Sequence, residues 1–296
     1  MSQQTTLSAA ITTVGQSSIT VTDPVGFPDD TVPFDVLIDA EVLTVSVGGV
    51  GETTWTVSRG AQGTTAATHL INATVTHVPA AYGELGDLLP MLALGADTSR
   101  YEMLLTMLAD TSRDIDAACM RSFAVPTVDE TFYVDIEEWE DCLSEASEDA
   151  RTTDGRALDF VSITNLYVRA DENSPYVELT AGDTTWWLEP GPPGTGVAGT
   201  DWPWEDVELS RWSTTPVFPV GRKAVKIVGR LGFPAIPDSV KRACLAETAE
   251  RFRQTIGGGP AQIGVTAFGS PIFLTGDSPA MRRILRDPFS RRPVAA

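Results

Sequence analysis

The sequence has few of the residues from which metal sites and disulfide frameworks are built. Its 296 residues include three cysteines and two histidines. Cys119, Cys142 and Cys244 are far apart and form no C-x-x-C motif, so we expect them to be reduced core residues. His69 and His77 stand in no H-E-x-x-H motif and beside no cysteine or carboxylate at ligand spacing. The sequence therefore predicts neither a metal site nor a cofactor.

Long apolar runs are absent as well. No window approaches twenty consecutive apolar residues, the length that a membrane-spanning helix needs. The first six residues have neither the positive charge nor the apolar stretch of a secretion signal. Because 42% of the residues are hydrophobic, we expect a globular protein without a membrane partner, which stays in the cytoplasm where it is made.

Positive charge is scarce, and both signs are unevenly distributed. Lys and Arg number 21 against 40 Asp and Glu, a formal net charge of -19. Gripping a phosphate backbone requires clustered Lys and Arg, so specific DNA binding is not expected, although DNA could pass nearby. Residues 129–149 carry ten acids and no base, whereas residues 281–296 carry five arginines and one aspartate. This asymmetry predicts two surfaces with different neighbours.

Signatures of common enzyme classes are missing or stand in the wrong context. Residues 194–199 match the dinucleotide string G-x-G-x-x-G, but Gly-Pro-Pro precedes them and Thr-Asp-Trp-Pro-Trp follows, where a strand and a helix are required. No phosphate-binding G-x-x-x-x-G-K-[ST] and no G-x-S-x-G motif occurs. A glycosidase needs a pair of carboxylates, and nothing marks two of the ten acids as buried. We expect no enzymatic activity, and a cell-wall glycosidase is the enzyme class left open.

The first 80 residues have the pattern of an all-β module. Turn residues separate several runs rich in β-branched residues, and a glycine-rich turn at residues 48–51 joins two of them as a hairpin would. The runs are residues 18–22, 34–39, 41–47 and 53–58. We expect a small β-barrel or sandwich.

From about residue 82 the hydrophobic period becomes helical. A capping box at residues 99–102 predicts the start of an amphipathic helix of about 22 residues. A shorter helix is expected around residues 84–94, ended or bent by Pro90. A third helix is predicted for residues 237–255, with proline at an early position.

A second β region is expected between the later helices, with its clearest strands at residues 131–136, 159–169 and 223–229. Residues 186–204 are too rich in proline and glycine for regular structure, so we expect a long loop pinned by aromatic side chains. Long loops usually contact a partner. We assign four tryptophans to such an interface, while a sugar-stacking platform that also includes Trp212 is the alternative: Trp186, Trp187, Trp202 and Trp204.

The C-terminal residues combine cations with apolar anchors on a segment too short for a core of its own. We predict that residues 277–296 form a peptide that docks into a groove of a partner, and a frayed tail is the alternative. The residues expected to make the contact are Arg282, Arg283, Ile284, Leu285, Arg286, Phe289, Arg291 and Arg292.

From about residue 82 onward, the order of elements resembles the head-to-tail connector (adaptor) family of long-tailed bacteriophages. The part most similar to it is Val225-Lys-Ile-Val-Gly-Arg-Leu-Gly-Phe233 followed by Ile236-Pro-Asp-Ser-Val-Lys-Arg-Ala243. Further segments that carry the resemblance are residues 84–89, 115–123 and 161–168. Residues 34–39 and 55–69 look like a separate β module of phage virion proteins, which here is an addition to the compact connector pattern.

The resemblance implies an α+β fold with three parts. Residues 1–80 form the β module, residues 81–276 a helical-bundle connector domain with an inserted β portion, and residues 277–296 a tail that docks into the portal protein. In such a family the subunits form a ring of about twelve copies beneath the portal, and the other face receives a tail-side stopper or terminator protein.

The function implied is structural. The chain would belong to the virion neck after assembly in the host cytoplasm, and would let the genome pass during packaging and ejection without binding it. An acidic lumen would let DNA slide, and candidate residues for it are Asp135, Glu137, Glu138, Glu140 and Asp141. The alternative is a virion or tail-tip protein that binds a host-surface glycan through the β module and the tryptophans.

Overall fold

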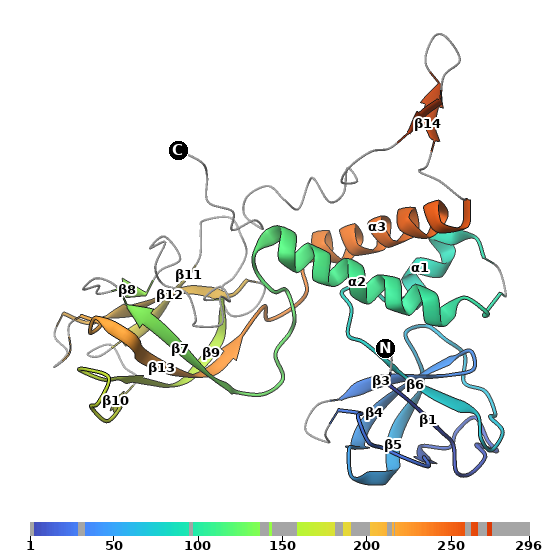
Figure 1. Ribbon diagram of the computed structural model, residues 1–296, viewed down its shortest axis with the longest axis horizontal. Helices are drawn as coiled ribbons and strands as arrows, with labels where there is room; N and C mark the ends of the chain where they lie inside the picture. Colours follow the sequence, from blue (N-terminus) through green and yellow to red (C-terminus); the bar gives the residue numbers. More distant parts are fainter. Residues whose placement is uncertain are drawn as a thin grey trace. The chain divides into compact units, whose positions relative to one another are not determined.

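The chain forms an α+β protein with three helices and three sheets among its described residues (Figure 1). The computed structural model describes residues 3–28, 33–94, 97–136, 142–143, 159–180, 186–190, 202–211, 215, 217–257, 262–265 and 271–273. The chain divides into two compact units, Met1–Ile115 with Ser239–Arg283, and Asp116–Asp238 with Ile284–Ala296. No helix of the described part is long and apolar enough to cross a membrane.

The first unit begins with a six-stranded antiparallel sheet in the order β1-β6-β3-β4-β5-β2. An isolated bridge between Leu7 and Val21 joins the ends of the two outer strands, so the sheet curves into a barrel-like shape. The strands are β1 (Gln4–Thr6), β2 (Ser18–Thr20), β3 (Phe34–Ile38), β4 (Glu41–Gly49), β5 (Glu52–Ala61) and β6 (Thr74–Val78). The β structure predicted for the start of the chain is confirmed, whereas the boundary at residue 80 stays a prediction.

Trp55 is the centre of the core of this sheet. It is fully buried, and its ring centroid lies 5.1 Å from that of Phe27 and 5.7 Å from that of Phe34. Its indole Nε1 donates a hydrogen bond of 2.7 Å to the carbonyl oxygen of Glu52, so the one polar atom of the ring is satisfied. Gly48 has φ +116°, and a Cβ there would overlap the Trp55 ring. The glycine-rich turn therefore both closes the hairpin and makes room for the tryptophan.

Three helices complete the described helical structure: α1 (Leu85–Leu92), α2 (Tyr101–Cys119) and α3 (Asp238–Gly257). Pro90 lies inside α1, so of the two expected effects, ending or bending this helix, it does not have the first. The helix ends after Leu92, where Ala93 takes a left-handed conformation. The expected start and length of the other two helices are confirmed to within a few residues, because their apolar period is a local property of the sequence.

The second unit holds a seven-stranded antiparallel sheet. Five strands follow the order β11-β12-β9-β13-β7, while β10 pairs with β9 and β8 pairs with β12. In the sequence all seven strands lie between α2 and α3. The strands are β7 (Glu130–Ile136), β8 (Cys142–Leu143), β9 (Phe160–Val168), β10 (Val177–Leu179), β11 (Trp186–Pro190), β12 (Trp204–Leu209) and β13 (Gly221–Leu231). A hairpin of β14 (Gln262–Val265) and β15 (Pro271–Phe273) follows α3, where a short β segment was expected.

Two expectations need correction. The described residues contain three helices and no large helical bundle. The irregular loop predicted for residues 186–204 is wrong at both ends, because Trp186 and Trp187 belong to β11 and pair with Leu209 and Glu208 of β12. Most prolines and glycines that motivated the prediction lie at residues 190–199, at and after the last residue of β11, and therefore say little about the tryptophans on either side.

Candidate functional site

The structure locates only part of the residues to which the sequence assigned a contact. The portal-docking candidates Arg282, Arg283, Ile284, Leu285, Arg286, Phe289, Arg291 and Arg292 lie outside the described residues, as do the lumen candidates Glu137, Glu138, Glu140 and Asp141. Asp135 is half-buried on β7, and its Oδ1 accepts a hydrogen bond of 2.6 Å from the backbone N–H of Lys223. The assigned roles of all these residues stay predictions.

The four tryptophans assigned to an interface lie in or beside the second sheet. Trp186 and Trp202 are buried, with 5% and 3% exposure. Trp186 donates 2.8 Å to the carbonyl oxygen of Leu179, and Trp202 donates 2.9 Å to Oε1 of Glu205. Trp187 and Trp204 are half-buried. Two of the four thus pack within their own unit, and the interface itself stays a prediction.

A buried arginine, missed by the sequence analysis, ties four segments of the second unit together. The guanidinium of Arg121, just beyond α2, donates to both carboxylate oxygens of Asp159 and, at 3.4 Å, to Oε1 of Glu205. It also lies over aromatic rings, of which the two nearest have their centroids 4.7 Å (Phe233) and 5.3 Å (Trp202) away. We call these five residues the Arg121 cluster. A buried ion pair is stable only when its charged groups are well hydrogen-bonded. Since the five residues come from different segments, these contacts hold the end of α2 against the start of β9, β12 and the end of β13.

Within this cluster, Asp159 is the residue whose charged form is disfavoured by burial. Burial raises the pKa of its carboxyl to about 6, which outweighs the lowering effect of the Arg121 charge and hydrogen bonds, while the nearby Glu205 adds to the rise. Two acids therefore share one guanidinium away from water. An arrangement of this kind holds segments in place, and it responds to acid and base through Asp159.

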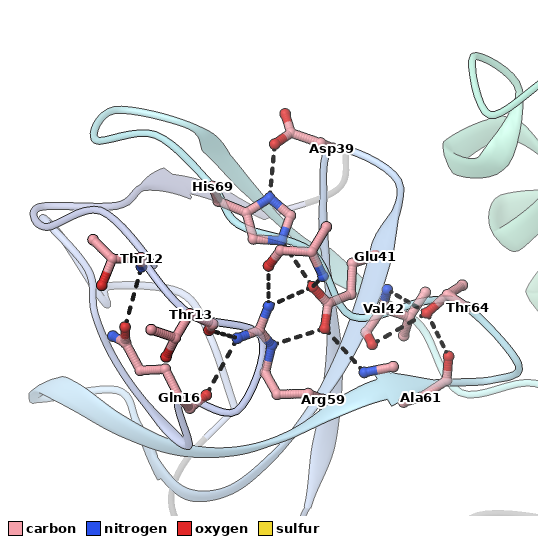
Figure 2. Close-up of polar contacts among 12 residues, drawn as sticks. Thr12, Thr13, Gln16, Asp39, Glu41, Val42, Arg59, Ala61, Thr64 and His69 are labelled. Carbon is pink, nitrogen blue, oxygen red and sulfur yellow. Dashed lines mark hydrogen bonds and ion pairs between the residues drawn. The ribbon is translucent and has the colours of Figure 1, made fainter.

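A second buried cluster lies in the first sheet and centres on Glu41 (Figure 2). Its carboxylate is fully buried and accepts hydrogen bonds from Arg59 Nε at 2.8 Å and Arg59 Nη2 at 2.6 Å. The backbone N–H groups of Gly60 and Ala67 add two more, each at 2.9 Å. His69 Nε2 lies 2.8 Å from the same carboxylate. Every lone-pair direction of Glu41 is thus occupied by a group of the same chain.

The same contacts fasten two loops to the sheet. Arg59 also donates to the carbonyl oxygens of Thr13 at 3.2 Å and Gln16 at 3.3 Å, as Figure 2 shows. The other ring nitrogen of His69 lies 2.8 Å from Asp39. We call Asp39, Glu41, Arg59 and His69 the Glu41 cluster. Three residues of the segment 55–69, Arg59, Gly60 and His69, thus contact the buried Glu41 carboxylate.

A carboxylate-histidine-carboxylate chain can also be part of a catalytic site, but the geometry of the Glu41 cluster favours a structural role. A general base needs a free lone pair within reach of a substrate. Burial by itself would raise the pKa of Glu41, yet the hydrogen bonds from Arg59, Ala67, His69 and Gly60 lower it to about 2. A carboxylate held this firmly in its charged form is a weak base. We therefore assign the Glu41 carboxylate a structural role.

A cleft of 610 Å³ lies in the first unit, with Asp35, Gln62 and His77 in its lining. Both carboxylate oxygens of Asp35 are engaged, one by Thr44 at 2.6 Å and the other by Gln62 at 2.7 Å. Burial lowers the pKa of His77, although the charge of Asp35 opposes it, so the imidazole is neutral at pH 7. Among the described residues no group of three or more His, Cys, Asp or Glu could hold a metal ion.

The helices α2 and α3 pack directly against each other through small and polar side chains. Thr248 Oγ1 donates to Thr111 Oγ1 at 3.1 Å, and Ser112 Oγ lies 3.5 Å from the sulfur of Cys244. At the surface of the pair, Arg251 Nη1 bonds to Asp114 at 2.6 Å. The seven strands of the second sheet therefore lie, in the sequence, between two helices that are in contact.

No protein-family model matches this chain, and no curated protein matches it either. Among solved structures, it is similar to a chain in the neck of an empty GTA (gene-transfer-agent) particle with C6 symmetry. The sequence identity is 15%, the alignment covers 65% of this chain and 91% of that chain, and the TM-score is 0.35. A TM-score of this size does not establish a shared fold, so the function proposed below rests on the residues of this chain.

Proposed function

We propose that this chain is a structural subunit of the neck of a tailed-phage-like particle and joins the head to the tail. The observation that carries the proposal is the insertion of a seven-stranded sheet between α2 and α3, two helices that pack against each other. The sequence segments that resemble connectors form the elements of this frame: residues 84–89 fall in and before α1, and residues 161–168 in β9.

The structure gives a physical reason for the glycine and phenylalanine in residues 225–243, the segment most similar to the connector family. It runs along β13, passes Gly232 and Phe233, and enters α3. Gly232 has φ +137°, and a Cβ there would overlap the carbonyl oxygen of Ala124, so only glycine fits. Phe233 then packs on Phe123 with ring centroids 4.8 Å apart. The glycine and phenylalanine of the segment thus set the path from the sheet into the helix.

The finer features of the proposal follow the resemblance and the charge of the chain. About twelve copies form a ring beneath the portal protein, residues 281–296 dock into the portal, and a stopper or terminator protein binds the opposite face. The net charge of -19 lets DNA pass through the ring without adhering to it. Both buried clusters fit a structural role, because the carboxylates of Glu41 and Asp159 are engaged inside the protein.

The experiment that tests this function is inactivation of the gene in the phage that encodes the chain, followed by electron microscopy of the lysate. A neck subunit predicts DNA-filled or leaking heads and separate, complete tails, and a plasmid copy of the gene should restore joined particles. Joined particles that fail to adsorb to cells would overturn the proposal and favour a tail-tip protein that binds a host glycan.

A further inference from the structure

Among the described residues, one face of the second sheet carries cations that form no ion pair within 4.0 Å. Lys226 lies in β13, directly opposite Tyr133 of β7 on one side and Tyr167 of β9 on the other. Its Nζ lies 4.6 Å from the ring centroid of Tyr167 and 5.8 Å from that of Tyr176. We define the basic-tyrosine face by the residues Tyr133, Tyr167, Arg169, Tyr176, Lys223 and Lys226.

The neighbouring cations are held by rings and backbone carbonyls in the same way. Lys223 Nζ lies 5.0 Å from the ring centroid of Tyr133, and the Arg169 guanidinium lies 5.1 Å from that of Tyr176. Arg169 also donates to the carbonyl oxygens of Glu172 at 2.9 Å and Arg222 at 2.6 Å. Such contacts orient a cation, but they do not neutralise its charge.

This face differs from the rest of the described structure. Over the described ranges, no carboxylate oxygen lies within 4.0 Å of a charged nitrogen of Arg169, Lys223 or Lys226. Most other described cations form an ion pair with an aspartate or glutamate: Arg59, Arg100, Arg113, Arg121, Arg230, Lys241, Arg251 and Arg253. Adjacent cations repel one another, and an incoming anion would offset that repulsion. In a chain with 40 acids and 21 bases, such a face is a candidate binding surface.

We propose that the basic-tyrosine face binds the carboxylates of a second copy of this chain, supplied by residues 137–149. These residues contain seven acids and no base. The inference rests on the proposed function, because a closed ring of identical subunits needs two different, complementary patches on each copy. Subunits that each carry a net charge of -19 repel one another, so a contact between them requires a local match of opposite charges.

A nucleic acid fits this face less well than a carboxylate-rich protein segment. Lys226 lies over Tyr167, so that ring is not open for a base to stack on. Phosphate binding draws most of its affinity from clustered charge over a large surface, which an acidic chain opposes.

The test is a charge-swap experiment on the full chain, with self-association measured by sedimentation velocity across protein and salt concentrations. The basic-face variant is Lys223→Glu with Lys226→Glu, and the acidic variant is Glu137→Lys, Glu138→Lys and Glu140→Lys. A control with the same change in net charge as the basic-face variant is Arg113→Glu with Arg242→Glu, two exposed positions on α2 and α3. Circular dichroism of each variant establishes that it is folded.

We expect the natural chain to self-associate, more weakly as salt rises. The basic-face and acidic variants should each raise the dissociation constant by about tenfold or more, the control should change it by less than about twofold, and a mixture of the two variants should recover association. The inference is overturned if the natural chain stays monomeric, if the control loses association equally, or if the basic-face variant loses only binding to duplex DNA. None of these outcomes depends on the morphology of the particles. The proposed function is therefore tested separately, by electron microscopy of the lysate.

Discussion

At the scale of single residues, the two buried ion clusters respond to pH in opposite directions. In the Glu41 cluster, hydrogen bonds overcome burial and hold the pKa of Glu41 at about 2. In the Arg121 cluster, burial overcomes the attraction of the arginine and raises the pKa of Asp159 to about 6. At Asp159, burial and the nearby Glu205 raise the pKa more than Arg121 lowers it, whereas at Glu41 the hydrogen bonds from Arg59, Ala67, His69 and Gly60 outweigh burial.

The first unit should lose stability in acid through Glu41. Its folded pKa of about 2 lies below the ordinary 4.5, so the stabilisation is complete above pH 4.5 and is lost as the pH falls toward 2. The full effect corresponds to about 3 kcal/mol. Hydrogen exchange of peptides that cover β4 and β5 should therefore quicken between pH 4.5 and 3 in the natural chain, after correction for the intrinsic rate. In Glu41→Gln the same peptides should exchange faster at pH 7 with a flatter pH dependence, and an equal slope in both proteins would contradict the account.

The second unit should show the reverse dependence through Asp159. Its folded pKa of about 6 lies above the ordinary 3.8, so the folded state is favoured below pH 3.8 and this contribution is lost as the pH rises through 6. The difference in unfolding free energy between the natural chain and Asp159→Asn, measured by urea titration at several pH values, isolates this group. We expect the natural chain to lose about 3 kcal/mol relative to the variant between pH 4 and 7. A constant difference would show that Asp159 keeps an ordinary pKa.

At the scale of elements, local sequence patterns predicted the helices and the long strands. They could not predict which segments far apart in the sequence pair in a sheet. The capping box and apolar period anticipated α2, and β-branched runs anticipated β9 and β13. The strands β10 to β12 were missed because they are short and are fixed by pairing across the sheet, as in the register of Trp186 with Leu209. The Arg121 cluster joins residues 121, 159 and 205, which no local pattern links. The same limit hid the basic-tyrosine face, since Tyr133, Tyr167 and Lys226 meet only in the folded sheet.

The turn from β13 into α3 gives a direct test of how the sheet is joined to the helix. Replacing Gly232 with alanine places a Cβ against the carbonyl oxygen of Ala124 at a positive φ of +137°, so both strain and overlap result. We expect a loss of about 3 kcal/mol in unfolding free energy, measured by urea denaturation. Gly15→Ala is the matched control, because nothing lies within 4 Å of a Cβ there, and it should leave stability within about 0.5 kcal/mol of the natural value. Equal stability of the two variants would contradict the packing described for this turn.

At the scale of the whole molecule, an inserted sheet, a strongly acidic chain and an arginine-rich C-terminal segment together support the proposed neck subunit. The frame of α2, the sheet and α3 is described by the structure, while the docking role of residues 281–296 comes from their sequence and the resemblance. The uneven distribution of charge along the sequence predicts two surfaces with different neighbours, but not which partner each would meet. Charge explains solubility and steering between partners, whereas specific assembly requires shaped surfaces.

The proposed function requires that this chain binds to a portal ring. The most direct measurement is cryo-electron microscopy of portal rings from the same particle mixed with the full chain or with a chain truncated after Asp277. We predict a symmetric ring of added density on the portal with the full chain, and its loss with the truncated chain, since the truncation removes all five arginines of residues 281–296. Portal rings that bind neither protein would contradict the assignment of this chain to the neck.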